Sequence, residues 1–259
     1  MSEMDLFKEK CNAEIIHQGG NDELLSLTNE WLVESAISNY SYHFEWFGRP
    51  IIQYPQDIVA MQEIIWRVKP DLIIETGIAR GGSLIFSASM LAQIDMCEAI
   101  EQGTVFDPTK SQRKVLGIDI DIRSHNRTAI DSHPMRSWIE MIEGSSIDQS
   151  IVDRVCAFAK PFKKILVCLD SNHTHEHVLA ELNAYASLVS VDSYCVVFDT
   201  IIEDMPDDMF PDRPWSKGNN PKTASAEFLK THPEFEINRN IQNKLLITVA
   251  PDGFLRRKA

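Results

Sequence analysis

The sequence predicts an α/β fold built on a doubly wound, mostly parallel sheet. Between residues 72 and 199, short apolar runs alternate with amphipathic helical segments, and such alternation requires crossover connections between parallel strands. The last two strand-like runs, FEINRN and KLLITVAPDGFLRRK, have no long helix between them. We therefore expect an antiparallel pair at one edge of the sheet.

The predicted elements follow one another in a regular order. A helix over 56–68 has apolar residues at i, i+3, i+4 and i+7 spacing and ends at the Lys69-Pro70 pair. A strand ending at Glu75 and a helix from Ser83 come next, before a polar insertion at 98–113. The remaining strands are expected at 115–120, 138–143, 164–170 and 194–199, and the remaining helices at 123–132, 148–159 and 175–189.

The first 50 residues are expected to form a helical and aromatic extension, and residues 51–259 to form the main domain. An amphipathic pattern from Asn21 to about Asn39 predicts one helix. Five aromatic residues follow it: Tyr40, Tyr42, Phe44, Trp46 and Phe47. This segment either packs on the core or acts as a lid or an oligomer contact, since tyrosine and tryptophan combine a large apolar face with a polar tip. On this ground we expect a homo-oligomer.

Length and composition bound the class of protein. The 259 residues are 44% apolar and 24% charged, which is ordinary for one large globular domain. The net charge of −13 argues against nucleic acid as a partner, because a phosphate backbone needs a basic surface. The five cysteines form no CxxC pair, and no stretch reaches the roughly 18 uncharged apolar residues of a membrane span. We expect a cytoplasmic protein without a membrane span.

The glycine-rich turn after the first strand predicts a cofactor site. Residues 72–83 read LIIETGIARGGS, in which Glu75 ends the strand and three glycines follow: Gly77, Gly81 and Gly82. Such a strand, turn and helix can hold a dinucleotide, a phosphate or a nucleoside cofactor. The dinucleotide fingerprint does not require a carboxylate ahead of the glycines. A carboxylate there suits a ligand with a cationic amino group and no phosphate, such as the methionine part of S-adenosylmethionine.

Asp119, at the end of the next strand, is placed like the acidic residue that accepts hydrogen bonds from ribose hydroxyls. Its separation from the turn exceeds the roughly 20 residues of a compact unit, and the 98–113 insertion accounts for the excess. Together, Glu75 and Asp119 favour S-adenosylmethionine over NAD.

Two further acids, Asp170 and Asp199, end the following strands and should lie side by side. Carboxylates held close repel unless a cation lies between them or a proton is shared. Hard oxygen ligands and water suit Mg²⁺, which would orient a substrate hydroxyl and lower its pKa; helix caps or turn acids are the alternative interpretation. Thr200 is a candidate third ligand, with Glu203 and Asp204 as its substitutes.

Three histidines follow Asp170 in LDSNHTHEHV. His173 is closest to the strand end and is the candidate general base or substrate contact, whereas His177 is expected to be structural. Zinc is weakly indicated because the HExxH arrangement is absent. In SKGNNPKTA, the residues Asn219, Asn220 and Lys222 either cap the next helix or recognise the acceptor.

Five ordered motifs resemble the family known as cephalosporin hydroxylases, which includes rhamnosyl O-methyltransferases. The motifs are YSYHFEWFGRPIIQYPQDI, DLIIETGIARGGSL, VLGIDIDIR, LDSNHTHEHV and KLLITVAPDGF, and the similarity runs from about residue 40 to 257. The resemblance implies a class I S-adenosylmethionine-dependent methyltransferase fold, Rossmann-like, with seven strands of which the last are antiparallel. It also implies Mg²⁺ at the ends of the fourth and fifth strands.

The same resemblance implies roles for the cofactor residues. Those around the methionine end would be Glu75, Thr76, Gly77, Arg80, Gly81, Gly82 and Ser83. Asp119 would hold the ribose, with Ser145 and Ser146 near the adenine. The sequence departs from the family at the metal, because members commonly show Asp-Asp after the fourth strand and Glu-Asp after the fifth. This chain has Asp170-Ser171 and Phe198-Asp199, which with Thr200 is closer to the Asp and Asp-Asn pattern of catechol-type methyltransferases.

The sequence thus predicts a metal-assisted, S-adenosylmethionine-dependent O-methyltransferase acting on a sugar hydroxyl of a glycan or a glycosylated natural product. Asp170 and Asp199, through Mg²⁺, would hold the acceptor oxygen, and His173 would accept its proton. An NAD-dependent enzyme acting on a nucleotide sugar is one alternative. Others are a glycosyltransferase with a metal-nucleotide site at residues 119–121, and a cofactor-binding scaffold without activity.

Overall fold

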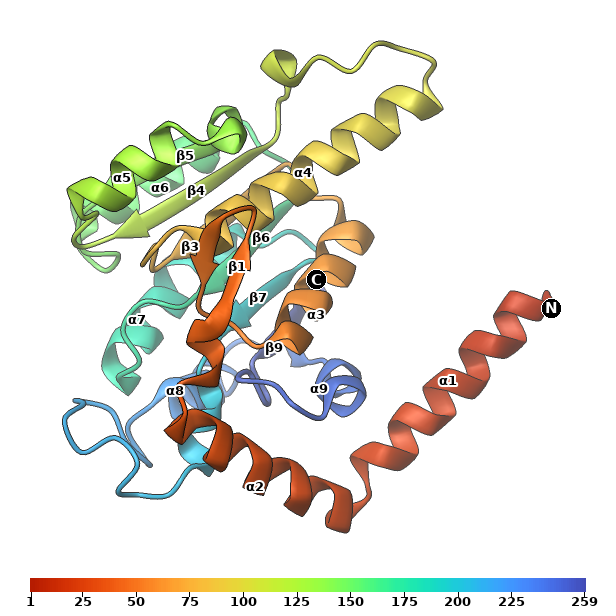
Figure 1. Cartoon of the computed structure of the whole chain (residues 1–259), viewed down its shortest axis with the longest axis vertical. Coiled ribbons are helices and arrows are strands. Elements are labelled where there is room, and N and C mark those ends of the chain that lie inside the picture. Colours follow the sequence, from red (N-terminus) through yellow and green to blue (C-terminus); the bar gives the residue numbers. More distant parts are fainter.

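One mixed sheet of seven strands organises the protein, and the computed structural model describes all residues, 1–259 (Figure 1). The strand order is β5-β4-β3-β6-β7-β9-β8. The strands are β3 (Leu72–Thr76), β4 (Lys114–Asp119), β5 (Ile139–Glu143), β6 (Ile165–Leu169), β7 (Tyr194–Val197), β8 (Phe235–Ile237) and β9 (Phe254–Arg257). Strands β3 to β7 are parallel, and β9 is antiparallel to both β7 and β8. The predicted doubly wound sheet with an antiparallel edge is confirmed.

The strand order reverses between β3 and β6. From β3 the chain moves outward to β4 and β5, then crosses back to β6 on the other side of β3. Open α/β sheets bind ligands at the carboxyl ends of the strands beside such a reversal. The fold therefore places the ends of β3, β4 and β6 where a ligand site is expected.

The helices cover both faces of the sheet. They are α3 (Pro55–Val68), α4 (Gly82–Glu101), α5 (Ser124–Asp131), α6 (Gln149–Ala159), α7 (His175–Tyr185), α8 (Pro221–Phe228) and α9 (Arg239–Leu245). Successive side chains of a strand point to opposite faces. Ile73 accordingly packs in the core layer that includes residues of α3, α4, α5 and α9, whereas Leu72 and Ile74 pack in the layer of α6, α7 and α8. Burial on both faces explains why β3 is buried throughout and why its apolar residues, Leu72 to Ile74, do not alternate with polar ones.

Helix α4 is long and apolar enough, by length and composition alone, to cross a membrane. Half of its most apolar window is buried inside the protein, where it packs against α3 and β4. Asp95 and Glu98 near its end bind Arg113, each at 2.9 Å. Its apolar character is that of a core helix.

The last strand is shorter than predicted. Of KLLITVAPDGFLRRK, only Phe254–Arg257 forms a strand, and the first residues belong to α9. Leu246 and Asp252 have positive φ angles, +60° and +61°, which an extended strand does not contain. The chain therefore turns twice before it enters the sheet.

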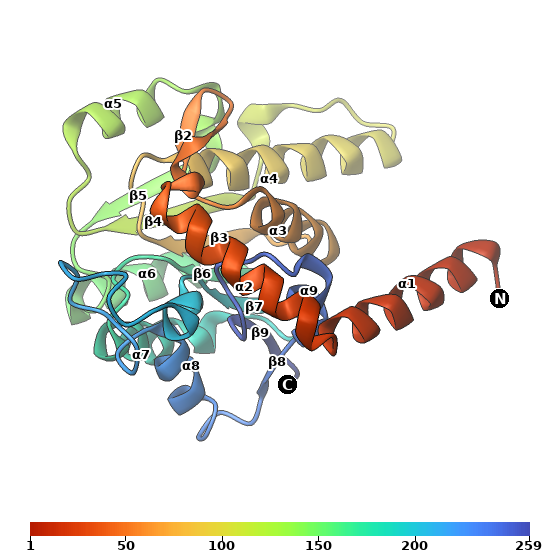
Figure 2. The same cartoon turned by 60° about the horizontal axis from the view of Figure 1, so that its bottom comes forward.

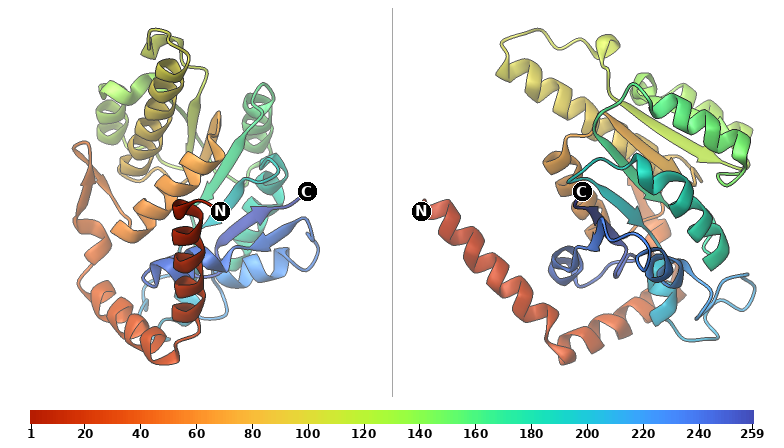
Figure 3. Two further views of the ribbon diagram at one scale, coloured as in Figure 1. Left: turned by 90° about the vertical axis from the view of Figure 1, so that its right-hand side faces the viewer. Right: turned by 180° about the vertical axis from the view of Figure 1, so that it is seen from behind.

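The N-terminal segment contains two helices and a hairpin, where the sequence predicted one helix. They are α1 (Glu3–Gly19), α2 (Asp22–Ile37) and the strands β1 (Phe44–Trp46) and β2 (Arg49–Ile51). Helix α1 has no buried residue, lies beside α9 and extends away from the body of the molecule (Figures 2 and 3). The hairpin is held to α4, because Trp46 Nε1 donates to Ser89 Oγ at 2.9 Å.

Candidate active site

A cavity of about 870 Å³ lies at the carboxyl ends of β3, β6 and β7. The turn after β3 forms one side of it, and the ends of β6 and β7 form another. Helix α2, the residues after β2 and the 201–215 segment complete the wall. The cavity coincides with the reversal of strand order, so it is the candidate active site.

The turn after β3 is shaped by close backbone packing. Gly77 has a φ of +88°, and a Cβ atom on it would lie 2.0 Å from the carbonyl oxygen of Asp170. Asp119 Oδ2 accepts hydrogen bonds from the amides of Ile78, at 2.8 Å, and Ala79, at 3.2 Å. Arg49 Nε donates to the carbonyl of Arg80 at 3.0 Å. Strand β4, the loop after β6 and the hairpin therefore hold this turn from three sides.

The predicted cofactor residues divide into two groups. Four of them line the cavity: Gly77, Arg80, Gly82 and Ser83. The others lie outside its wall: Glu75, Thr76, Gly81, Asp119, Ser145 and Ser146. The turn itself faces the cavity, whereas the residues expected at the ribose and adenine ends do not.

Glu75 lies beneath the turn. Its side chain is only 4% exposed, and Ser83 Oγ donates a hydrogen bond to it. Burial raises the pKa of Glu75 to about 7, although the bond from Ser83 opposes the rise. The sequence predicted direct contact with a cationic amino group; the structure instead interposes Ser83 between Glu75 and the cavity.

Ser146 belongs to a buried polar network. Its Oγ donates to Glu181 Oε1 at 2.5 Å, and Ser171 Oγ donates to the same oxygen at 2.6 Å. His177 Nε2 lies 3.4 Å from Glu181, and Tyr185 donates to the carbonyl of Ser146. The Ser146 side chain therefore joins the loops after β5 and β6 and does not face the cavity. The position of His177 agrees with the structural role predicted for it.

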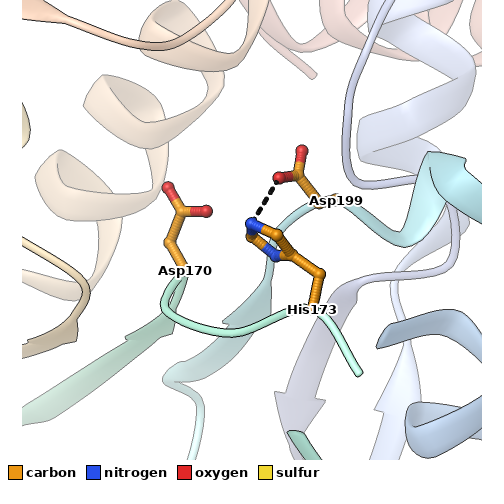
Figure 4. A group of neighbouring side chains, drawn as sticks. All are labelled: Asp170, His173 and Asp199. Atoms are coloured by element: carbon orange, nitrogen blue, oxygen red, sulfur yellow. Dashed lines mark ion pairs between the residues drawn. The ribbon is translucent and has the colours of Figure 1, made fainter. Parts of the chain in front are cut away.

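Asp170, His173 and Asp199 come together at the ends of β6 and β7 (Figure 4). One ligand atom from each lies within 4.8 Å of the others, and His173 Nε2 is 3.1 Å from Asp199 Oδ2. Asp199 is held in the left-handed region, with φ 55°, where a non-glycine residue is uncommon. The side chains of all three residues line the cavity together with the cofactor turn.

The environment of Asp170 disfavours its ionised form. Burial raises the pKa of Asp170 well above its ordinary value, and the nearby charges of Asp199 and Glu75 raise it further. Gln53 opposes the rise, since its Nε2 donates to Asp170 Oδ2 at 3.1 Å. Carboxylates in such a position are stabilised by a cation or by a shared proton.

The prediction that Thr200 helps to hold the metal is wrong in this geometry. Its side chain is fully buried, and its Oγ1 donates to the carbonyl of Pro251 at 2.7 Å. Of the proposed substitutes, Glu203 accepts a bond from the amide of Gly218, and Asp204 pairs with Lys222. Neither acid joins the Asp170 cluster, and the hydroxyl of Thr200 is bonded to Pro251.

The structure does not place Asn219, Asn220 or Lys222, the predicted acceptor contacts, in the wall of the cavity. Asn220 caps α8, with its Oδ1 accepting from the amides of Lys222 and Thr223. Asn219 binds the amide of His175 and the carbonyl of Pro214. Lys222 pairs with Asp204 at 2.7 Å. Helix capping, the first of the two interpretations of this segment, accounts for Asn220.

Three cavity residues escaped the sequence analysis. Gln53 supports Asp170, and Trp215 packs edge-on against His173, with ring centroids 4.8 Å apart. Arg213 lies over the Trp215 ring at 5.2 Å. A tryptophan directly after the acidic, proline-broken segment 199–214 was an available signal for a binding residue, but Gln53 offers none in the sequence.

A model of the family described as rhamnosyl O-methyltransferase/CmcI matches residues 38–258. A rhamnosyl O-methyltransferase of Mycobacterium tuberculosis (strain H37Rv) is 31% identical over 204 residues, which cover 78% of this chain and 73% of that protein. The rhamnosyl O-methyltransferase of Mycobacterium leprae (strain TN) is 29% identical over 239 residues, 92% of each chain.

Among solved structures, apo CmcI has a TM-score of 0.52 at 18% identity and covers 84% of this chain and 77% of its own. CmcI with Mg and SAM has a TM-score of 0.51 at 18% identity, with coverage of 84% and 78%. At this identity the two structures support the fold. Together with the family model, they confirm the resemblance seen in the five sequence motifs. The chain belongs to the rhamnosyl O-methyltransferase/CmcI family.

Proposed function

We propose that the protein is an S-adenosylmethionine-dependent O-methyltransferase that uses a divalent cation, Mg²⁺ in the first instance, to methylate a sugar hydroxyl of a glycan or glycosylated natural product. One observation carries the proposal: the glycine turn after β3 and the Asp170, His173 and Asp199 cluster face one cavity. Family membership supports it, since the matched relatives are named rhamnosyl O-methyltransferases and CmcI has been solved with Mg and SAM.

The cofactor would lie along the turn after β3. Gly77, Arg80, Gly82 and Ser83 would surround its methionine end, and Glu75 would act through Ser83. Thr76 and Gly81 would contribute only through their backbone, since neither residue lines the cavity. Asp119 would accept hydrogen bonds from the ribose hydroxyls in addition to those from the amides of Ile78 and Ala79. Ser145 would lie near the adenine, and Ser146 would support the same loop through its bond to Glu181.

The residues present fit a divalent cation. Asp170 and Asp199 offer carboxylate oxygens, the donors that Mg²⁺ prefers. Gln53, which is 7% exposed and lines the cavity, has an Oε1 without a hydrogen-bond partner, so the site retains an unused acceptor beside Asp170. When bound, the cation would supply charge that orients the acceptor hydroxyl and lowers its pKa.

His173 can take one of two roles at this centre. As the sequence predicted, it can accept the proton of the acceptor hydroxyl, or it can be a further ligand of the cation. The ring nitrogen that contacts Asp199 is Nε2, so this single atom would serve either role. The two roles therefore exclude each other while a cation is bound.

Positioning supports methyl transfer in this cavity. Bringing an acceptor oxygen to about 3 Å from the methyl carbon accounts for much of the rate of such reactions. The contact of Gly77 with the carbonyl of Asp170 sets the separation between the cofactor turn and the loop that carries the acids. The backbone at Gly77 would therefore govern how the methyl group meets the acceptor.

The proposed division into domains takes account of which segments line the cavity. Residues 51–259 would form the methyltransferase domain, and residues 1–50 an extension whose helix α2 contributes Leu32, Val33 and Ala36 to the wall. This apolar side would face the acceptor. Self-association and a cytoplasmic location stay predictions.

The test is transfer of a labelled methyl group from S-adenosylmethionine to a panel of glycosides with free hydroxyls, with and without Mg²⁺. A methyl ether on the sugar, detected by mass spectrometry and lost with a chelator, is expected. The alternatives require binding of NAD or of a UDP-sugar. Asp121, which a glycosyltransferase site would use, is 71% exposed and lies 3.9 Å from Arg123 outside the cavity wall, so it does not favour that alternative.

A further inference from the structure

His173 is directed at the two carboxylates of the cluster (Figure 4). Ligand atoms that share one cation at about 2.0 to 2.2 Å lie about 3 to 4 Å from each other. In the structure, the three atoms of Asp170, His173 and Asp199 lie within 4.8 Å of one another. A small movement of these side chains therefore suffices for a single ion to contact all three.

No other histidine, cysteine or acidic side chain joins this group. Phe198, which precedes Asp199, is 6% exposed and belongs to the core. Asp57 is buried nearby, and its carboxylate accepts hydrogen bonds from Thr248 and from the amide of Val249. Among histidine, cysteine and acidic side chains, His173 alone joins the two aspartates.

Two contacts prepare the group for a ligand. Gln53 donates to Asp170 from a position that is 7% exposed, and its Oε1 has no hydrogen-bond partner. Trp215 packs edge-on against the His173 ring at 4.8 Å, beneath Arg213. Partners of this kind fix the orientation of metal ligands in proteins. The imidazole is thus oriented by its neighbours as well as by Asp199.

We propose that His173 is a direct ligand of the cation, so that the site of this chain consists of one imidazole nitrogen and two carboxylates. This deepens the proposed function and rests on it. Imidazole suits Mn²⁺, Fe²⁺, Co²⁺ and Zn²⁺ better than it suits Mg²⁺, which favours oxygen ligands and water. The site consequently binds a first-row transition ion in preference to Mg²⁺.

The experiment uses the full chain, freed of metal with a chelator and saturated with S-adenosylhomocysteine. Mn²⁺ is added, and pulsed electron paramagnetic resonance measures coupling of its unpaired electrons to nitrogen. Titration calorimetry gives the affinities for Co²⁺ and Mg²⁺. We expect coupling to one imidazole nitrogen, and we expect His173→Asp to remove it and to lower the ratio of Co²⁺ to Mg²⁺ affinity by about tenfold or more. The change in this ratio is diagnostic, because most sites of mixed donors already bind Co²⁺ more tightly.

His175→Ala is the matched control. His175 is two residues away, its Nδ1 lies 2.8 Å from Thr223 Oγ1 and its Nε2 lies 3.3 Å from Glu227, and it does not line the cavity. This variant should keep the nitrogen coupling and the affinity ratio. Thermal unfolding of His173→Asp and His173→Ala verifies that both variants fold.

Three results would overturn the inference: bound Mn²⁺ without nitrogen coupling, no cation binding at all, or a His173→Ala variant that loses methyl transfer while its Co²⁺ affinity is unchanged. The last result would make His173 the proton acceptor and leave the proposed function intact. Failure of the function is seen separately, as absence of S-adenosylhomocysteine binding to the metal-free protein.

Discussion

Residues 75–83, which comprise the end of β3 and the turn after it, and residues 199–222, which follow β7, both lie at the carboxyl edge of the sheet. Both segments were predicted to bind ligands. The first presents its backbone and Ser83 to the cavity. In the second, Asp199 faces the cavity, but Thr200 and Asn220 form hydrogen bonds that stabilise the fold itself. The two segments therefore differ in whether their polar groups are already hydrogen-bonded within the fold.

The difference shows which polar residues a sequence can assign. A glycine turn after a strand exposes backbone groups, and no side chain of its own competes for them. An asparagine ahead of a helix is drawn to the unpaired amides of the first turn, whatever lies nearby. The side chain of a residue such as Asn220 is therefore already hydrogen-bonded to the helix and is not free to bind a substrate.

Among the variants of these two segments, Gly77→Ala should have the largest effect on stability and on cofactor binding. The added Cβ would meet the carbonyl of Asp170 at 2.0 Å and would hold a φ of +88°, costing about 3 kcal/mol of unfolding free energy. Chemical denaturation measures the loss, and calorimetry should show that S-adenosylhomocysteine binding disappears. Gly48→Ala is the control, because its φ is +77° with no atom within 4 Å; equal losses in the two variants would refute the role of the close contact.

Glu75→Gln sharpens the account of the buried acid. Since burial raises the pKa of Glu75 from 4.5 to about 7, the native protein holds a proton there that the unfolded chain has released. Stability is therefore lost as pH rises from about 4.5 to 7. The variant lacks this titration, so its unfolding free energy relative to wild type should rise by about 2 to 3 kcal/mol between pH 5 and 8.

Denaturation at several pH values checks this result. Asp57, whose pKa burial also raises to about 7, is present in both proteins, so its own titration cancels in their difference. A difference that does not change with pH would mean that Glu75 is ionised in the folded protein throughout this range.

Asp199→Asn tests the functional part of the second segment. Loss of one carboxylate from the cluster should lower kcat/KM about 100-fold, or about 2.7 kcal/mol of transition-state stabilisation. Affinity for S-adenosylhomocysteine should stay within about twofold, because the cofactor turn is untouched. Asp204→Asn is the matched control in the same segment, where the acid pairs with Lys222; a similar loss of activity there would argue against a special role for Asp199.

Asn220→Ala and Lys222→Ala should have the smallest effects on chemistry. Removing the Asn220 cap costs about 1 to 2 kcal/mol of stability, and removing the Lys222 pairs costs under about 1 kcal/mol. KM for the acceptor should change by less than about twofold in both, as measured by steady-state kinetics. A tenfold rise in KM in either folded variant would restore the predicted contact with the acceptor.

Much of the fold followed from sequence because its cause is local. Alternating apolar runs and helices required a doubly wound sheet, and strand ends alone brought Asp170 and Asp199 together. The direction of Glu75 did not follow, since a strand buried on both faces has no polar side to mark the cavity. Gln53 and Trp215 reach the site through tertiary packing of distant segments, which periodicity does not encode.

Calorimetric titration of the full chain with S-adenosylhomocysteine and, separately, with NAD tests the central claim most directly. The account predicts one S-adenosylhomocysteine bound per chain, no measurable binding of NAD, and loss of the first signal in Gly77→Ala but not in Gly48→Ala. Binding of NAD in place of S-adenosylhomocysteine would contradict it.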